Sequence, residues 1–186
     1  IDYVAITGLL HGIGPKERPI VPGNYLGDYA GGGMMLAFGM TAALLAVQRG
    51  GKGQIVDAAL SDGPALIGAL TYGLRAAGLW KDQRESNLLD GGSETYGIYR
   101  CSDGRFVAIG AIERQFQEAL FKGLALRPGS DREEIATVIR SRTRDEWAAH
   151  FAGTDACVAP VLDLEEAPLH PHNIARRTFV DLEGVF

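Results

Sequence analysis

Two carboxylates stand where the sequence predicts the start of a helix, and both are candidates for chemistry. Asp28 lies in the stretch GNYLGDYAGGG, from Gly23 to Gly33, just ahead of a long apolar run. Glu113 follows the apolar run VAIGAI and begins a predicted helix. A carboxylate at such a place can cap the helix, belong to a loop that contacts a ligand, or transfer a proton. The surrounding residues have to distinguish these roles.

For Asp28, the residue types alone favour a structural role. Aspartate is a preferred N-cap residue because its side chain accepts hydrogen bonds from the unpaired amides of the first turn, and the helix dipole favours its charge. A phosphate cradle on Gly31–Gly33 fits poorly, since the carboxylate would repel phosphate and no Gly-x-Gly-x-x-Gly motif or Walker lysine is in register. A helix cap and a catalytic group both stay open.

The other polar residues give weaker signals. Glu113 is also an ordinary partner for a helix dipole, and Asp90, ahead of two glycines, is typical of a turn. His170 and His172 lie two residues apart around a proline, which is a weak metal-ligand pattern. No serine stands in a Gly-x-Ser-x-Gly elbow. We therefore predict no metal site and no serine nucleophile.

The composition is that of an ordinary globular protein. The 186 residues are 46% hydrophobic and 22% charged, with a formal net charge of −5, so neither a nucleic-acid nor a membrane partner is expected. Cys101 and Cys157 have no metal-ligand spacing and suit free thiols in a reducing compartment. The first residues, IDYVAITG, do not have the pattern of a signal peptide and resemble the interior of a longer chain. We expect a cytoplasmic protein of which this chain is a fragment.

The first half of the chain predicts two apolar helices joined by a strand. The run from Ala30 to Val47 carries no charge, and its length is borderline for a membrane span. Its Gly and Ala content favours a buried helix instead. This helix is expected to stop at Arg49–Gly53. GQIVDAAL predicts a buried strand. A second helix is expected from about Gly63 to Leu79, capped by Ser61 or Asp62. This order indicates an α/β layer.

Beyond the polar segment Lys81–Asn87, a candidate domain boundary, the pattern changes. TYGIYRC and RFVAIGAI flank Ser102-Asp103-Gly104 and predict a β-hairpin. Three helices are expected next, over about Glu113–Leu124, Asp131–Ser141 and Arg144–Phe151. Ser130 stands in capping-box spacing ahead of Glu133. ACVAPVLDL predicts a strand in which Pro160 favours an edge position.

Several motifs in this order resemble those of one enzyme superfamily. GDYAGGG, followed by an apolar helix and GGKGQIVDAAL, is similar to family III CoA-transferases and α-methylacyl-CoA racemases, and NLLDGGSETYGIYRCSDGRFVAIGAIERQF resembles the racemase branch. The similarity runs from Ile1 to Phe179. It implies an α/β fold with these parts: residues 1–58 as the end of a Rossmann-like, CoA-binding large domain, 59–88 as connecting helices, 89–165 as a small α/β domain, and 166–186 as a return linker.

The resemblance also implies residue roles. Asp28 would be an acid/base paired with a histidine in a racemase, or an acyl carrier through a mixed anhydride in a transferase. Glu113 would act from the opposite face of the substrate, while Asn24 and Tyr96 would hydrogen-bond within the catalytic network. Family members are interlocked homodimers, so Asp28 and Glu113 could meet across chains.

One expected catalytic residue has no counterpart in this chain. The racemase histidine belongs to a Gly-His-Asp segment directly before the stretch that matches Ile1, Asp2 and Tyr3, which is expected to contact the substrate or its CoA. His11 is too far downstream to replace it. We therefore expect the chain to lack this histidine and most of the CoA-nucleotide site, and to be catalytically incomplete alone.

Taken together, these roles predict an acyl-CoA racemase, an isomerase of fatty acid metabolism that acts on 2-methylacyl-CoA thioesters. Inverting a carbon beside a thioester needs one group that removes the α-proton and another that returns a proton on the opposite face. The intervening enolate needs donors near the thioester oxygen. No cofactor is expected apart from the coenzyme A of the substrate. The alternatives are a family III CoA transferase with Asp28 as nucleophile, and a catalytically incomplete fragment.

Overall fold

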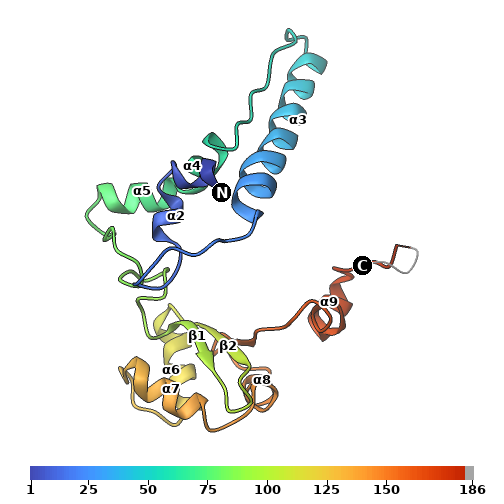
Figure 1. The fold of residues 1–186 in the computed structure, drawn as a ribbon. Helices are drawn as coiled ribbons and strands as arrows, with labels where there is room; N and C mark the ends of the chain where they lie inside the picture. Colours follow the sequence, from blue (N-terminus) through green and yellow to red (C-terminus); the bar gives the residue numbers. More distant parts are fainter. Residues whose placement is uncertain (183–186) are drawn as a thin grey trace. The chain divides into compact units, whose positions relative to one another are not determined.

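The computed structural model describes residues 1–182, which divide between two compact units, Ile1–Ser93 and Glu94–Phe186 (Figure 1). We call them unit 1 and unit 2 and describe each by itself. The four domain limits predicted from the sequence are finer than this division, and they stay predictions.

The longest element of unit 1 is a continuous helix over Tyr25–Gln48. Its first part, η1 (Tyr25–Met34), is a π-helix, and its second part, α3 (Met35–Gln48), is an α-helix (Figure 1). The predicted stop signal is confirmed: Gly50 is left-handed, with φ 87°, and the amide of Gly51 donates to the carbonyl of Ala46 at 2.9 Å. These are the features of a Schellman cap.

Four shorter helices complete unit 1: α1 (Asp2–Ala5), α2 (Leu9–Gly12), α4 (Asp62–Ile67) and α5 (Ala69–Ala76). The single helix predicted from about 63 to 79 is wrong, because the chain breaks at Gly68 with ψ 0°. Leu9 occupies the space there, and a Cβ on Gly68 would lie 2.5 Å from Leu9 Cδ2. Ser61 precedes α4, but its hydroxyl donates to Asp62 and caps no helix amide.

The strand predicted at GQIVDAAL is also wrong. Residues 51–59 have no regular structure and return along α3 in an extended path (Figure 1). A strand needs a neighbour with which to exchange backbone hydrogen bonds, and unit 1 contains no other strand. Ile55, which was expected to be buried in this strand, is 96% exposed.

The predicted apolar helix is present as α3, but the prediction that it is buried is wrong: residues 1–182 do not bury it. No residue of α3 is buried, and Phe38 is 74% exposed. In the most apolar 18-residue stretch of Tyr25–Gln48, only 11% of the residues are buried. By its length and composition, this helix could cross a membrane. Length and composition alone do not separate a membrane span from a helix that another surface covers, so the absence of a membrane partner stays a prediction.

Unit 2 contains an antiparallel sheet in the order β1 (Tyr96–Arg100), β2 (Phe106–Gly110), β3 (Val158–Pro160) (Figure 1). The predicted hairpin is confirmed, with Tyr96 opposite Gly110 and Gly104 left-handed at the turn, with φ 81°. Pro160 lies in an edge strand, as expected for a residue that cannot donate to the ladder.

Three helices follow the hairpin where the sequence predicts them: α6 (Arg114–Gly123), α7 (Arg132–Ile139) and α8 (Arg144–Phe151). They pack with the sheet around a core that includes Val107, Leu120, Ile135 and Trp147. After β3 the chain forms η2 (Ala167–Leu169) and α9 (Pro171–Arg176). The mixed α/β class is therefore confirmed, and its sheet belongs to unit 2.

The capping box of α7 lies one residue later than predicted. Asp131 accepts from the amide of Glu134 at 2.9 Å, and the Glu134 carboxylate accepts from the amide of Asp131 at 3.0 Å. The sequence SDREE offers this pair and the Ser130–Glu133 pair in equal spacing. Ser130 is fully buried, which leaves the exposed Asp131 as the cap.

A charge cluster joins the start of α8 to the segment after β3. Arg144, whose side chain is buried, donates to both carboxylate oxygens of Glu166 at 2.6 and 2.7 Å, and to the carbonyl of Val161 at 3.1 Å. Arg105 donates to the same carboxylate at 2.8 Å. The hydrogen bonds from Arg144 hold the pKa of Glu166 at about 2 and raise the pKa of Arg144. The cluster thus depends on the ionised form of Glu166.

This dependence predicts a loss of stability in acid. A carboxyl group whose pKa falls on folding from 4.5 to about 2 stabilises the protein fully above pH 4.5, and that stabilisation is lost as the pH falls through 2. We expect the free energy of unfolding in urea to fall more steeply between pH 4.5 and 2 in the wild type than in Glu166→Gln. Glu165→Gln, in which the neighbouring exposed glutamate changes instead, should behave as the wild type. Parallel pH profiles for wild type and Glu166→Gln would contradict the prediction.

Candidate functional site

Asp28 lies in the first turn of η1 and does not cap it. The N-cap position belongs to Asn24, whose carbonyl accepts the amide of Asp28 at 3.1 Å and that of Tyr29 at 3.3 Å. The Asn24 side chain makes no capping hydrogen bond. The sequence therefore predicts a helix start here correctly, but the cap interpretation of Asp28 is wrong by one turn. π-Helical turns occur frequently at functional sites.

The glycines around Asp28 let neighbouring elements approach the η1 backbone. A Cβ on Gly31 would lie 2.3 Å from Pro64 Cδ, and one on Gly63 would lie 1.8 Å from the Gly31 carbonyl oxygen. A Cβ on Gly32 would lie 2.6 Å from Leu60 Cδ2. Real Cβ atoms do not come this close, so η1 and α4 pack backbone against backbone. The missing side chains of Gly31 and Gly32 therefore make room for Pro64 of α4 and for Leu60, which precedes α4.

The segment Ile1–Tyr3 also comes close to this turn. It enters α1, and buried Val4 of α1 contacts Gly27, where a Cβ would lie 3.3 Å from Val4 Cγ2. The side chains of Ile1 and Tyr3 are more than half exposed. The structure thus brings α1, which contains Asp2 and Tyr3, into contact with the residue that precedes Asp28.

Asp28 itself is exposed, and so is Asn24. The carboxylate of Asp28 takes part in no hydrogen bond or ion pair with the residues described, because the buried side of η1 is occupied by glycines. An acidic group in a first helical turn is favoured electrostatically. The arrangement therefore presents an available carboxylate one residue after Gly27, where α1 contacts η1.

Glu113 is the N-cap residue of α6, as the predicted helix start implies. Its backbone carbonyl accepts the amides of Phe116 and Gln117, each at 3.0 Å. Its exposed side chain makes no capping hydrogen bond, and residues 1–182 provide it with no ion-pair partner. Like Asp28, Glu113 presents an available carboxylate at a helix start.

Tyr96 and Glu113 belong to the same end of the hairpin. Tyr96 begins β1 opposite Gly110, three residues before Glu113. Gln117 fixes this end, since its amide donates to the Thr95 hydroxyl at 3.3 Å and to the Ile112 carbonyl at 3.0 Å. The sequence analysis missed Gln117. The only signal available was its position one turn after Glu113 on the same helix face.

The structure thus assembles the predicted residues in two groups. Asn24, Asp28 and the Ile1–Tyr3 segment belong to unit 1, and Tyr96 and Glu113 belong to unit 2. Within unit 1, the amide of Asp28 donates to the carbonyl of Asn24 at 3.1 Å, and in unit 2 Tyr96 pairs with Gly110, three residues before Glu113. The predicted side-chain hydrogen bonds of Asn24 and Tyr96 to the catalytic groups stay a prediction.

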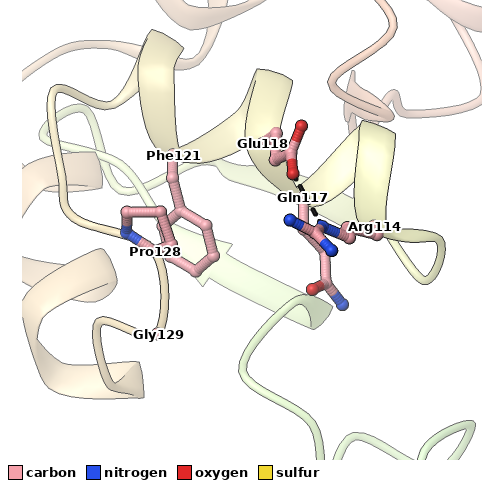
Figure 2. A pocket seen from close by; sticks show the side chains of 6 residues that line it. All are labelled: Arg114, Gln117, Glu118, Phe121, Pro128 and Gly129. Carbon is pink, nitrogen blue, oxygen red and sulfur yellow. Dashed lines mark hydrogen bonds and ion pairs between the residues drawn. The ribbon is translucent and has the colours of Figure 1, made fainter.

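A hollow of about 340 Å³ lies near Glu113 but contains none of the predicted site residues. Figure 2 shows its lining: Arg114, Gln117, Glu118, Phe121, Pro128 and Gly129. Arg114 donates to Glu118 at 2.9 Å across one helical turn, so its charge is already paired. This pairing leaves the hollow without a charge directed at a ligand.

Three histidines, His11, His150 and His170, each contact a protein group through a ring nitrogen. His11 Nε2 lies 3.6 Å from the carboxylate of Asp82. His170 is the N-cap of α9, and its Nδ1 accepts the amide of His172 at 3.3 Å, which accounts for the His-Pro-His pattern. Residues 1–182 contain no group of three or more potential metal ligands.

Comparison with known proteins places the chain in a family. The sequence profile of CoA-transferase family III matches residues 2–185. The chain belongs to this family. The resemblance seen in GDYAGGG and the motifs that follow is therefore confirmed.

Among its relatives, the chain is similar to proteins named α-methylacyl-CoA racemase. It is 42% identical to that of Homo sapiens (98% of this chain, 51% of that protein) and 40% identical to that of Mus musculus (97% and 51%). It is 28% identical to a succinyl-CoA–L-malate CoA-transferase alpha subunit of Chloroflexus aurantiacus (97% and 47%). The chain spans about half the length of these curated relatives.

Solved structures support the fold. The CAIB/BAIF family protein of Brucella suis has a TM-score of 0.71 at 21% identity, covering 98% of this chain and 52% of that one. Rv3272 of Mycobacterium tuberculosis has a TM-score of 0.70 at 18% identity, covering 100% and 52%. These likenesses concern the fold alone.

The contact between η1 and α4 predicts a position-dependent effect of alanine. Gly63→Ala places a Cβ against the Gly31 carbonyl and should lower the free energy of unfolding by about 1–3 kcal/mol through overpacking. Gly73→Ala, in α5, meets open space and should raise the same quantity by about 0.5–1 kcal/mol, since alanine is the better helix former. Urea unfolding measures both, and equal effects at the two positions would contradict the packing described.

Proposed function

We propose that this chain is part of an acyl-CoA racemase that interconverts (R)- and (S)-2-methylacyl-CoA thioesters. The observation that carries the proposal is the pair of carboxylates, Asp28 and Glu113, each exposed at a helix start and engaged by no side chain described. Relatives named α-methylacyl-CoA racemase, at 42% and 40% identity, support it. Both groups suit proton transfer, because neither is held in a structural ion pair.

In the proposed reaction, a base removes the proton from the carbon beside the thioester, and an acid on the other face returns one. The electron pair of the broken C–H bond moves into the enolate and returns to the carbon when the new C–H bond forms. Asp28 serves one face together with a histidine, and Glu113 serves the other. His11 lies 3.6 Å from the carboxylate of Asp82, and we do not assign the role of this histidine to it. General acid–base groups placed in this way typically accelerate such steps by about 10²–10⁴-fold each.

The supporting residues have assigned places in this proposal. Ile1–Tyr3 contact the thioester or its CoA beside the Asp28 turn, and Asn24 and Tyr96 orient the two carboxylates. Since Asp28 and Glu113 belong to different units, we propose a homodimer in which one site draws on both kinds of unit. CoA enters as part of the substrate, and no other cofactor takes part.

A second candidate function is CoA transfer, which the relatives named as transferases at 28–29% identity favour. There the Asp28 carboxylate would attack the thioester carbonyl, the C–S bond would break, and CoA would leave as its thiolate. The CoA thiolate would then attack the Asp28 carbon of the mixed anhydride, which releases the donor as its carboxylate and leaves Asp28 as a CoA thioester. An acceptor carboxylate would displace CoA from this thioester to form a second mixed anhydride, and the CoA thiolate would attack its acceptor carbonyl, which gives the CoA thioester of the acceptor and frees Asp28. An exposed carboxylate suits this step too, but the step does not need Glu113.

The test uses the full-length protein that contains residues 1–186, incubated with a 2-methylacyl-CoA in D₂O. We expect deuterium at the α-carbon without any acceptor acid. Asp28→Asn and Glu113→Gln should each lower the exchange rate by about 10²–10⁴-fold, with CoA affinity nearly unchanged. Asp57→Asn, a matched change at another exposed aspartate of unit 1, should leave the rate as in the wild type.

The outcomes separate the two functions. Formation of the CoA thioester of an acceptor acid without deuterium at the α-carbon, at a rate unchanged by Glu113→Gln, would contradict the racemase and support the transferase. Wild-type exchange in Asp28→Asn would refute the role of Asp28 in racemisation.

A further inference from the structure

Glu113 lies between the sheet and α6, where the chain has left the strand and has not yet entered the helix. β2 ends at Gly110, and α6 begins directly after Glu113. The amide of Ala111 still donates to the carbonyl of Thr95, at 2.9 Å. One residue further on, no backbone amide of residues 1–182 donates to the carbonyl of Ile112. The direction of the chain at Ile112 and Glu113 therefore depends on a side chain.

One residue, Gln117, binds the peptide groups on both sides of Glu113. Its side-chain amide donates to the carbonyl of Ile112 at 3.0 Å, and its backbone amide donates to the carbonyl of Glu113, also at 3.0 Å. These two carbonyls belong to the peptide units before and after the Cα atom of Glu113. Because a peptide unit is planar, holding both units restricts the direction in which the Glu113 side chain leaves the backbone.

The same side chain also reaches the residue before Tyr96. The amide nitrogen of Gln117 donates to the hydroxyl of Thr95 at 3.3 Å, so both of its protons are used. Thr95 is 2% exposed and is therefore a fixed point in the interior of unit 2. One carboxamide thus joins the residue before Tyr96 to the residue before Glu113.

These contacts leave the carboxylate of Glu113 at the end of a side chain that is exposed and makes no capping hydrogen bond. Such a side chain occupies staggered rotamers, whose positions in space follow from the backbone that carries them. A general base has to come within hydrogen-bond reach of the proton that it removes. A misplacement of about 1 Å can lower the rate about a hundredfold, so the restraint on the backbone matters for the chemistry.

We propose that Gln117 is the positioning residue of Glu113: it holds the two peptide units around Glu113 and so sets where the carboxylate meets the substrate. This inference rests on the proposed function, because it concerns the face of the substrate that Glu113 serves. Gln117 touches no reacting atom in this proposal and acts through the carbonyls of Ile112 and Glu113. Its bond to Thr95 keeps the same end of the hairpin in register with Tyr96.

The kinetic test uses the full-length protein with each enantiomer of a 2-methylacyl-CoA in D₂O. Gln117→Met keeps nearly the length of the side chain and removes both donors. We expect kcat for inversion to fall by about ten- to a hundredfold, with KM nearly unchanged. Gln83→Met is the matched control, since the exposed side chain of Gln83 makes no hydrogen bond among the described residues, and it should behave as the wild type.

The configuration of the deuterated product separates positioning from a general loss of stability. Glu113 faces the α-proton of one enantiomer only, and Asp28 serves the other face. In Gln117→Met, the enantiomer that faces Asp28 should still exchange its proton, mainly with retained configuration, while the opposite enantiomer exchanges slowly. A variant that is only less stable would lose exchange of both enantiomers and inversion alike, and this equal loss would overturn the proposal.

Hydrogen exchange of the backbone tests the contacts without any substrate. In Gln117→Met the amides of Ala111 and Phe116, which donate to the carbonyls of Thr95 and Glu113, should lose protection, while those in the middle of β2 keep it. If this variant does not fold, Gln117→Glu takes its place, because the shape stays and an ionised carboxylate cannot donate. Unchanged protection of both amides would contradict the positioning role.

Glu113→Gln distinguishes a failure of this inference from a failure of the proposed function. It should give the same pattern of retained configuration as Gln117→Met, but more strongly. If Glu113→Gln gives this pattern and Gln117→Met matches Gln83→Met, the positioning role fails and the proposed function stands. If Glu113→Gln exchanges both enantiomers as the wild type does, the proposed function fails, and hydrogen exchange alone decides whether Gln117 holds the backbone at Glu113.

Discussion

Unit 1 depends on one close contact, in which the backbone of η1 at Gly31 meets the backbone of α4 at Gly63. No residue with a side chain fits at either position, because a Cβ on Gly63 would lie 1.8 Å from the Gly31 carbonyl oxygen. Once α4 occupies this side of η1, and α1 approaches at Gly27, the only charged group of the helix, Asp28, is left exposed. The same packing that stabilises the unit thus determines where its candidate catalytic group lies.

In unit 2 a candidate catalytic carboxylate, that of Glu113, is also left exposed at a helix start, but other contacts place it there. Its core of sheet and helices places the end of β2 directly before α6, and Glu113 falls at the N-cap. Glutamate is not among the preferred N-cap residues, and the Glu113 carboxylate accepts no hydrogen bond from the amides of the first turn. Gln117 instead joins α6 to the strand end through Thr95 and Ile112. In both units, then, a helix start is stabilised by neighbouring groups, and the carboxylate stays available.

Residues 1–182 do not bury the apolar side chains of the α3 helix. Its apolar side chains have no cover within residues 1–182, and apolar surface of this extent marks a contact surface in other proteins. The helix nevertheless begins and ends where local signals place it, because η1 contacts and the Schellman cap fix its two ends. Local structure and tertiary burial are therefore determined by different parts of the molecule.

The sequence by itself determined the elements whose signals are local. The Asp103-Gly104 turn specified the hairpin, the capping-box pattern specified the start of α7 to within one residue, and spaced motifs specified the family. What failed, the strand at residues 53–60 and the helix across Gly68, depended on neighbours: a strand needs a partner, and Leu9 comes to Gly68 from 59 positions away. Likewise, only the tertiary structure decided that Gly31 contacts Pro64 of α4 and that Gly32 contacts Leu60. A glycine shows in sequence which close approach it permits, but the partner is supplied by packing across long separations in the chain.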